Sequence, residues 1–267
     1  MRGGASVWMP WPAEVLMPER ANEPVFDRTK EIEELRKRLG ERRTFLFHGE
    51  SGAGKSLLVR SLWCDFPKMI YCQADKGMQD VCRQVALRLR EKGNPTIKQK
   101  FGSKPGTILN GVSTISLRGI IASALKDAPY LLVLDHFSFA SQQFAALLKA
   151  WTSEATPVVV ISRSNHMEEI GYAAALFVER KDRLMLANFA PEVAREFIDW
   201  RIQKSGLEAE NLDEFKERMM SLSGGNPGTI TWLIRLSMLP KYRSGNHIKV
   251  TPLYLDFKIH GIHGMPQ

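Results

Sequence analysis

The chain has 267 residues, of which 44% are apolar and 25% charged, the proportions of an ordinary soluble globular protein. They exclude a disordered chain, a collagen and a coiled coil. Lys and Arg exceed Asp and Glu by eight, which favours a polyanionic partner. Three cysteines without CxxC spacing indicate neither a disulfide framework nor a zinc knuckle and suit a reducing compartment. Because the apolar runs are also too short to cross a membrane, we expect a cytoplasmic protein.

Strands and helices are predicted to alternate over the first two thirds of the chain. Residues 1–26 contain four prolines and predict an extended N-terminal arm. The core is expected over 27–190, and this alternation is typical of a parallel sheet covered by helices, an α/β fold. In chain order we expect helix 27–39, strand 44–48, helix 55–63, strand 69–72, helix 79–92, helix 116–126, strand 130–134, helix 142–151, strand 158–161 and strand 183–186.

The pattern changes after Phe189. Helices over 191–204, 212–222 and 228–239 follow without a strand between them, which predicts a small helical subdomain over 191–240. In the basic tail 241–267, apolar residues alternate with polar ones, as in a half-buried strand. These residues are Leu253, Leu255, Phe257 and Ile259. The segment 93–112, rich in glycine and proline, is predicted to be a long loop.

A phosphate-binding loop signature lies between the predicted strand 44–48 and the helix that follows it. The sequence GESGAGKS fits GxxxxGK[ST] completely. Its glycines let backbone N–H groups surround phosphate oxygens at a helix N-terminus. Lys55 is expected to reach the β- and γ-phosphates of a nucleotide, and the Ser56 hydroxyl to ligate Mg²⁺. The expected nucleotide contacts are Gly49, Glu50, Ser51, Gly52, Ala53, Gly54, Lys55, Ser56 and Leu57.

Asp135 ends the apolar strand 130–134 and is the predicted carboxylate that holds Mg²⁺ through water, together with Ser56. His136 follows where many ATPases of this type carry a glutamate that polarises the attacking water. An imidazole can accept a proton, but it is shorter than glutamate and not reliably anionic. We therefore expect slow hydrolysis, or another base such as Glu50. A packing or surface role for His136 is equally compatible with the sequence.

Arg163 follows the strand 158–161. If this strand lies beside the strand that leads into the phosphate-binding loop, the guanidinium is placed near the γ-phosphate. The predicted catalytic residues are therefore Lys55, Asp135, His136 and Arg163, with ATP and Mg²⁺ as cofactors.

Three short motifs resemble those of the AAA+/STAND ATPases, in particular the archaeal-ATPase and origin-recognition-like branch. Residues 26–35 resemble the F-x-x-R-x-x-E-x-x-x-L box, with spacing one residue tighter, and Arg163 looks like the STAND sensor arginine. Gly224-Gly-Asn-Pro227 is similar to the GxP motif, which implies that Pro227 contacts the nucleotide. The resemblance covers about 25–239 and implies a five-stranded parallel sheet, a helical lid over the nucleotide and an ATP/ADP-controlled assembly switch.

Basic residues are concentrated in two segments. Seven Lys and Arg lie between residues 83 and 104 against Glu91 alone, and four lie in 241–267 against Asp256 alone. The first segment could follow a DNA phosphate backbone. Lys98, Lys100 and Lys104 are the candidate DNA contacts, although a solvated basic face explains the same residues at least as well.

Together these features favour an ATP-binding AAA+/STAND-type ATPase that acts as a nucleotide-controlled switch, with a DNA transaction as one context. Two alternatives stay open: a weakly or non-hydrolysing ATP-binding adaptor in protein signalling and, with less support, a small-molecule kinase. The expected partners are ATP or ADP, further copies of the chain, duplex DNA and an unidentified protein, and no membrane.

Overall fold

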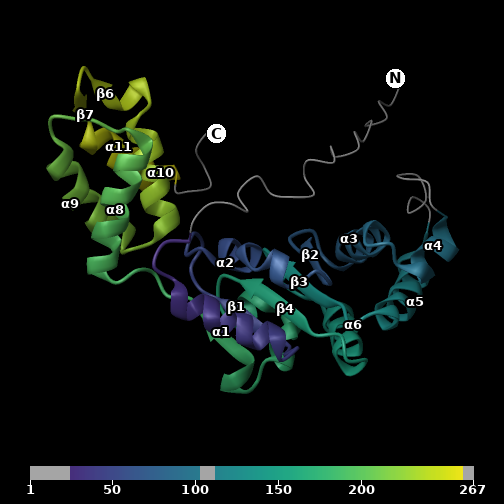
Figure 1. The fold of residues 1–267 in the computed structure, drawn as a ribbon. Helices are drawn as coiled ribbons and strands as arrows, with labels where there is room; N and C mark the ends of the chain where they lie inside the picture. The colour runs from purple at the N-terminus through teal and green to yellow at the C-terminus, as the bar shows by residue number, and fades with distance from the viewer. Residues whose placement is uncertain (1–24, 103–111, 261–267) are drawn as a thin grey trace, which may run out of the picture. The chain divides into compact units, whose positions relative to one another are not determined.

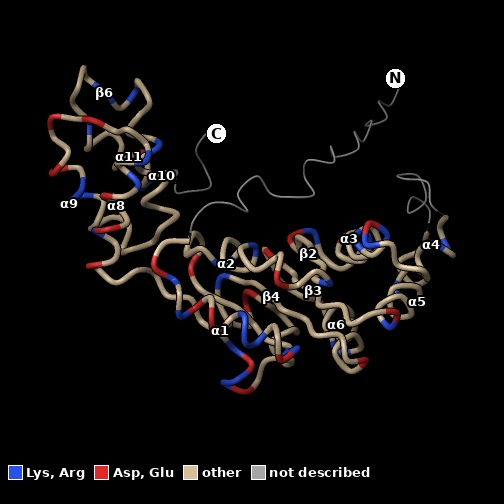
Figure 2. The backbone as a smooth tube through the Cα atoms, viewed as in Figure 1, with Lys and Arg blue, Asp and Glu red and all other residues tan. Residues whose placement is uncertain are grey.

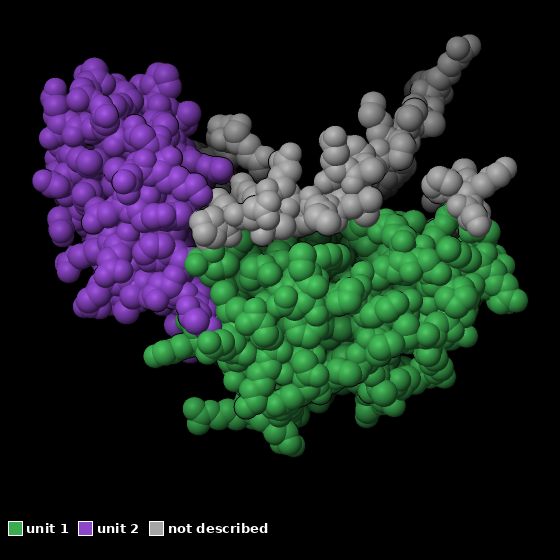
Figure 3. Space-filling model, viewed as in Figure 1, with its two compact units in different colours: residues 1–25, 30–46, 56–183 green, residues 26–29, 47–55, 184–267 purple. Residues whose placement is uncertain are grey.

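The computed structural model describes residues 25–102 and 112–260 (Figure 1). The predicted arm 1–26 therefore lies almost wholly outside the described residues. Two compact units are distinguished (Figure 3). Among the described residues, unit 1 contains 25, 30–46 and 56–183, whereas unit 2 contains 26–29, 47–55 and 184–260.

A five-stranded sheet has the strand order β2-β3-β4-β1-β5. β2 pairs with β3, and β3 with β4, in parallel; Tyr71 lies opposite Val133, and Leu134 opposite Val160. β3 and β4 are buried along their whole length, as expected for continuous apolar runs in a helix-covered sheet. The expected α/β architecture is therefore confirmed. The strands are β1 (Phe45–His48), β2 (Met69–Gln73), β3 (Leu131–Asp135), β4 (Val158–Ser162) and β5 (Arg183–Met185).

The helices of the α/β part alternate with these strands. They are α1 (Thr29–Gly40), α2 (Lys55–Ser61), α3 (Met78–Glu91), α4 (Pro95–Phe101), α5 (Thr114–Ala124), α6 (Gln142–Ser153) and α7 (Met167–Ile170). Short 3-10 turns are η2 (Trp63–Asp65), η3 (Leu125–Asp127), η4 (Tyr172–Leu176) and η5 (Arg180–Asp182). In the parts of the chain that the structure describes, no helix is long and apolar enough to span a membrane.

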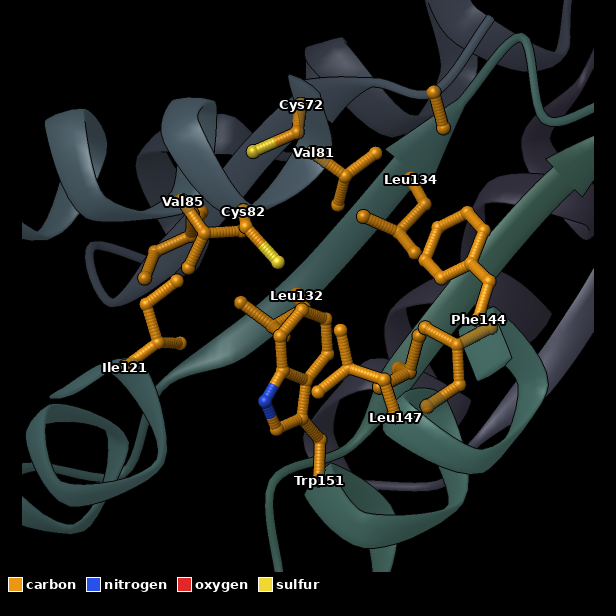
Figure 4. Close-up of a cluster of buried hydrophobic side chains, with 14 of the residues drawn as sticks. Cys72, Val81, Cys82, Val85, Ile121, Leu132, Leu134, Phe144, Leu147 and Trp151 are labelled. Atoms are coloured by element: carbon orange, nitrogen blue, oxygen red, sulfur yellow. The ribbon is translucent and has the colours of Figure 1, made fainter. Parts of the chain in front are cut away.

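One face of the sheet packs against α3, α5 and α6 (Figure 4). Leu132 and Leu134 of β3 meet side chains of all three helices there, including Trp151 of α6. Two cysteines lie in this cluster, and burial raises the pKa of the Cys72 thiol to about 12 and that of Cys82 to about 11. Both thiols therefore stay protonated at neutral pH and pack as small apolar groups.

The C-terminal part of unit 2 is helical and has its own core, which includes Ile198, Phe215, Ile230 and Leu233. The predicted helical subdomain is present over α8 to α10. The elements are α8 (Pro191–Ser205), α9 (Leu212–Ser223), α10 (Pro227–Ser237), the turn η6 (Pro240–Tyr242), the two-residue antiparallel strands β6 (Arg243–Ser244) and β7 (His247–Ile248), and α11 (Val250–His260).

The expected strand in the tail is wrong, because Val250–His260 is the helix α11. Leu253 is 1% exposed and Phe257, four residues later, packs on Trp232 at 5.6 Å between ring centroids. Leu255 and Ile259 are 51% and 71% exposed. The apolar residues therefore divide between two sides of a helix instead of sharing one face of a strand.

The expected loop over 93–112 is also partly wrong, because α4 occupies Pro95–Phe101. Asn94 caps this helix by accepting the Ile97 N–H at 2.9 Å, and Pro95 takes the first helical position. Asn followed by Pro is a common helix start, since Asn satisfies a free N–H and Pro has none to satisfy. The rest of the expected loop, 103–111, lies outside the described residues.

Candidate nucleotide-binding site

The phosphate-binding loop connects β1 to α2. Gly49, Gly52 and Gly54 have φ angles of 153°, 84° and 103°, in the region that side-chain-bearing residues rarely adopt. Lys55, the first residue of α2, is buried, and its Nζ donates hydrogen bonds to the carbonyl oxygens of Gly49 at 2.6 Å and Glu50 at 2.8 Å. The Lys55 ammonium is therefore held against the loop in which the motif places phosphate oxygens.

The glycines of the loop also permit close packing within unit 2. A Cβ on Gly52 would lie 2.5 Å from the Asn226 side-chain oxygen, and one on Gly228 would lie 2.6 Å from the Gly52 Cα. The Gly228 N–H donates to the Gly52 carbonyl at 2.9 Å. A Cβ on Gly49 would lie 2.2 Å from the Leu186 carbonyl oxygen. The loop therefore packs directly on the backbone that begins α10.

Asn226 links the start of α10 to this loop. Its side chain is 4% exposed; Oδ1 accepts the Thr229 N–H at 3.0 Å and so caps the helix, while Nδ2 donates to the Ser51 carbonyl at 2.8 Å. Nδ2 also donates to Asn188 Oδ1 at 3.1 Å, and Asn188 Nδ2 donates to the Glu50 carboxylate at 2.8 Å. Two residues of the loop, Glu50 and Ser51, are thus joined to α10 through amide side chains.

The sequence motif pointed to Pro227 and missed the roles of Asn226, Gly228 and Asn188. Pro227 is half-buried at the first turn of α10. The Asn-Pro pair was visible in the sequence as a helix start. The partners of the Asn226 amide nitrogen lie 38 and 175 residues away, so no local pattern could indicate them.

Phe26 and Arg28, at the start of the box motif, pack on the helical part of unit 2. The Arg28 side chain is 7% exposed and donates to the Ala187 carbonyl at 2.7 Å, with its guanidinium 4.4 Å from the Phe189 ring centroid. The Phe26 ring lies 5.3 Å from that of Phe197. These contacts fix the chain just before α1, so the motif has a packing role here.

Asp135 lies at the end of β3 in unit 1 and is 1% exposed. Its Oδ1 accepts the His136 N–H at 2.7 Å, and its Oδ2 accepts a hydrogen bond from the Tyr71 hydroxyl. Asp135, which was predicted to hold Mg²⁺, is therefore bonded to Tyr71, a residue that the sequence motifs did not indicate.

Burial and the negative charge of Asp135 raise the pKa of Tyr71 far above its ordinary value. Burial is the larger cause, because it disfavours the phenolate, and the neighbouring carboxylate adds to it. The Tyr71 hydroxyl is therefore protonated at neutral pH and acts as a donor to Asp135.

The donors at Ser56 and Asp135 fit Mg²⁺. This ion prefers hard oxygen ligands and is usually bound by one or two protein groups together with water and substrate phosphates. Among the described residues, no group of three or more His, Cys, Asp or Glu is placed to hold a metal ion. The Ser56 hydroxyl and the buried Asp135 carboxylate can supply the protein's share of such a site.

The other two predicted catalytic residues are exposed. The His136 side chain is 61% exposed, with Nε2 3.8 Å from Asp135 Oδ2. The Arg163 side chain is 69% exposed, and its Nε lies 3.5 Å from Glu169 Oε1. β4, which Arg163 follows, neighbours β1 in the sheet, and the Val158 N–H donates to the Thr44 hydroxyl at 3.1 Å. The strand arrangement that the Arg163 prediction required is therefore present.

The candidate DNA contacts are only partly described. Lys98 and Lys100 are exposed on α4, and Lys104 lies outside the described residues (Figure 2). Two basic residues upstream make local contacts: Arg88 pairs with Glu91 at 3.0 Å, and Lys92 donates to the Pro67 carbonyl at 2.7 Å. Part of the basic segment is thus used within unit 1.

A family model described as nSTAND1, novel STAND NTPase 1, matches residues 18–239. Among solved structures, the Walker-type ATPase PABY2304 of Pyrococcus abyssi is similar at 17% identity and a TM-score of 0.57, over 92% of this chain and 77% of that one. The ORC1 protein of Aeropyrum pernix, solved in complex with DNA, is similar at 16% identity and a TM-score of 0.59, over 92% and 69%. At these identities the likeness shows the shared fold. No curated protein matches the chain.

Proposed function

The chain belongs to the novel STAND NTPase 1 family, and from this premise we propose that it binds ATP with Mg²⁺ and acts as a nucleotide-controlled switch. The observation that carries the proposal is the pair of hydrogen bonds from Asn226 Nδ2 and the Gly228 N–H to the Ser51 and Gly52 carbonyls. They connect the phosphate-binding loop to the N-terminus of α10.

In this proposal, the loop 49–54 and the start of α2 bind the phosphates. The Gly54 N–H and the N-terminus of α2 favour anions there, and the Ala53 N–H would exchange the Glu50 carbonyl, to which it donates at 3.2 Å, for a phosphate oxygen. Leu57 and Pro227 are further proposed nucleotide contacts. The Lys55 ammonium exchanges its two loop carbonyls for phosphate oxygens. Mg²⁺, when bound, neutralises phosphate charge, and Ser56 and Asp135 would hold it.

The switch follows from the bonding of the loop carbonyls. A shift of the Ser51 or Gly52 carbonyl on nucleotide binding either breaks the hydrogen bonds from α10 or moves α10 with the loop. Leaving a buried polar group without its partner costs about 1–3 kcal/mol. The state of the loop and the position of α10 are therefore energetically coupled within unit 2.

Hydrolysis is proposed to be slow. His136 stands where a water-activating carboxylate would serve best, and the Glu50 carboxylate is engaged by Asn188. Phosphate release separates this proposal from its alternatives. Tight ATP binding without any release would favour an adaptor, and transfer to an added acceptor would favour a kinase.

Asn226→Asp tests the switch with little change in shape. Aspartate keeps the cap on the Thr229 N–H but cannot donate to Ser51 or Asn188. We expect ATP to change amide hydrogen exchange in α10 of the wild type, and this response to be lost in Asn226→Asp while α10 remains helical. Exchange measured by mass spectrometry, with and without Mg-ATP, gives the readout.

Asn94→Asp is the matched control. Asn94 is a buried helix cap whose Nδ2 donates to a distant carbonyl, that of Ala124 at 2.8 Å, but it lies on α4 in unit 1. It should destabilise the chain without removing the response of α10. The switch would be overturned if the wild type bound ATP without a change in the hydrogen exchange of α10. It would also be overturned if Asn226→Asp showed the same ATP-dependent change as the wild type.

Duplex DNA is a second, separate proposal for the partner. It is supported by the exposed Lys98 and Lys100 on α4 and by the Aeropyrum pernix ORC1 protein, which was solved with DNA. The proposed compartment is the cytoplasm, where the three thiols of this chain stay reduced.

A further inference from the structure

Tyr71 lies on the sheet face opposite to the cluster of Figure 4. It pairs with Val133 in the β2–β3 register, two residues before Asp135 pairs with Gln73. Residues two apart on a strand point to the same side, so Tyr71 and Asp135 are diagonal neighbours on one face, within reach of a long aromatic side chain. The register therefore brings the Tyr71 hydroxyl to the Asp135 carboxylate.

The ring of Tyr71 is held by two neighbours. The Arg60 guanidinium of α2 lies 5.8 Å from the ring centroid, and the Trp63 ring packs edge-on at 6.4 Å between centroids. With the ring held by these two residues, the hydroxyl is directed to the Asp135 carboxylate.

We propose that Tyr71 is a positioning residue of the magnesium site, whose hydroxyl orients Asp135 toward the ion. This inference rests on the proposed function, because it concerns the Mg²⁺ that accompanies ATP. The Tyr71 hydroxyl is the donor and Asp135 Oδ2 the acceptor of this hydrogen bond.

The same hydroxyl keeps the buried carboxylate in place. Asp135 Oδ1 already accepts the His136 N–H, and the Tyr71 hydroxyl engages Oδ2. Each oxygen retains a further lone pair that can accept from a metal-bound water. Without the hydroxyl, Oδ2 of a carboxylate that is 1% exposed loses its donor, and its orientation is no longer fixed.

Tyr71→Phe tests the inference, since it keeps the ring contacts with Arg60 and Trp63 and removes only the hydroxyl. ATP affinity is measured by isothermal titration calorimetry in Mg²⁺ and in EDTA. We expect the affinity in EDTA to be unchanged and the gain on adding Mg²⁺ to fall about tenfold, the size expected for one hydrogen bond to a charged group. In an Asp135→Ala background, Tyr71→Phe should cause no further loss of the gain, because the hydroxyl then has no carboxylate to orient.

Tyr242→Phe is the matched control, because the Tyr242 hydroxyl donates to the Asp256 carboxylate at 2.8 Å in unit 2. It should leave the Mg²⁺ gain at the wild-type value. A Tyr71→Phe protein with the full gain, or one that loses equal affinity in Mg²⁺ and EDTA, would overturn the positioning role while ATP binding stands. A wild type that binds no ATP in either buffer would instead refute the proposed function.

Discussion

His136 has the left-handed backbone conformation, with φ at 53°, directly after the buried Asp135. This conformation is costly for most residues and places the imidazole outward, where its side chain is 61% exposed. Its backbone N–H, and not its ring, makes the short hydrogen bond to Asp135. His136 therefore hydrogen-bonds Asp135 through its backbone. A substitution of the side chain should leave this hydrogen bond in place.

A glutamate at this position should act as a base toward the attacking water. We expect His136→Glu to raise the rate of phosphate release about tenfold or more, with little change in ATP affinity, because a positioned carboxylate base accelerates water attack. His136→Gln has the same backbone cost and no base, so its rate should stay at or below that of the wild type. The measurement is steady-state phosphate release with saturating Mg-ATP. Equal rates for the two variants would mean that the base lies elsewhere.

At the residue scale, the sequence indicated those site residues that belong to a contiguous motif. Residues 49–56 could be recognised because the glycines and Lys55 are adjacent in the chain. Tyr71 could not be recognised, since an aromatic residue in a strand usually packs, and only the register of β2 against β3 gives its hydroxyl a carboxylate partner. Asn226 was seen as part of a motif, but the partners of its amide nitrogen were not.

At the element scale, the strands were predictable and the last helix was not. β3 and β4 are runs of apolar residues bounded by polar ones, a pattern with few alternative interpretations. In α11 the alternating apolar residues imitate a strand, yet Leu253 and Phe257 are also spaced four apart, which suits a helix. Contact with Trp232 on α10 decides between the two periodicities.

The two faces of α11 give a direct test. Leu253→Ala should lower the free energy of unfolding by about 2–5 kcal/mol, because it leaves a cavity in the core of the helical part. Leu255→Ala, which removes the same atoms from a side chain 51% exposed, should change it by no more than about 0.5 kcal/mol. Urea unfolding followed by circular dichroism measures both. If the two substitutions lowered the free energy of unfolding equally, both side chains would lie on one buried face. That result would indicate the strand that the sequence pattern favours.

At the scale of the whole molecule, the two units do not follow the boundaries expected from the sequence. The predicted division placed the phosphate-binding loop in a core over 27–190, whereas residues 47–55 group with the helical part in unit 2. The reason is contact between distant segments: Gly49 packs on Leu186, and Gly52 on Asn226 and Gly228. Composition along the chain carries no signal for such pairings.

The proposed binding of duplex DNA also belongs to the scale of the whole molecule. If the basic segment contacts phosphates, wild-type protein with Mg-ATP should bind unrelated duplexes similarly, and binding should weaken steeply with salt. Replacing Lys98, Lys100 and Lys104 with Ala should weaken binding uniformly and flatten the salt dependence, with ATP affinity intact. Fluorescence anisotropy at several salt concentrations is the measurement.

Three exposed lysines outside the segment, Lys30, Lys37 and Lys149, provide the control triple variant. This control removes the same number of positive charges. It should bind DNA more tightly than the variant of Lys98, Lys100 and Lys104, and its affinity should depend more steeply on salt. Absence of DNA binding by the wild type at low salt would refute this partner and favour the adaptor.

The central claim, a nucleotide site built on the loop 49–54 and Lys55, is tested most directly by ATP titration of Lys55→Ala in Mg²⁺. The wild type should bind, and the variant should lose about tenfold to a hundredfold in affinity or more, because an ammonium–phosphate interaction is lost. Lys149→Ala, an exposed lysine on α6, should bind like the wild type. A folded Lys55→Ala protein with wild-type ATP affinity would contradict the account.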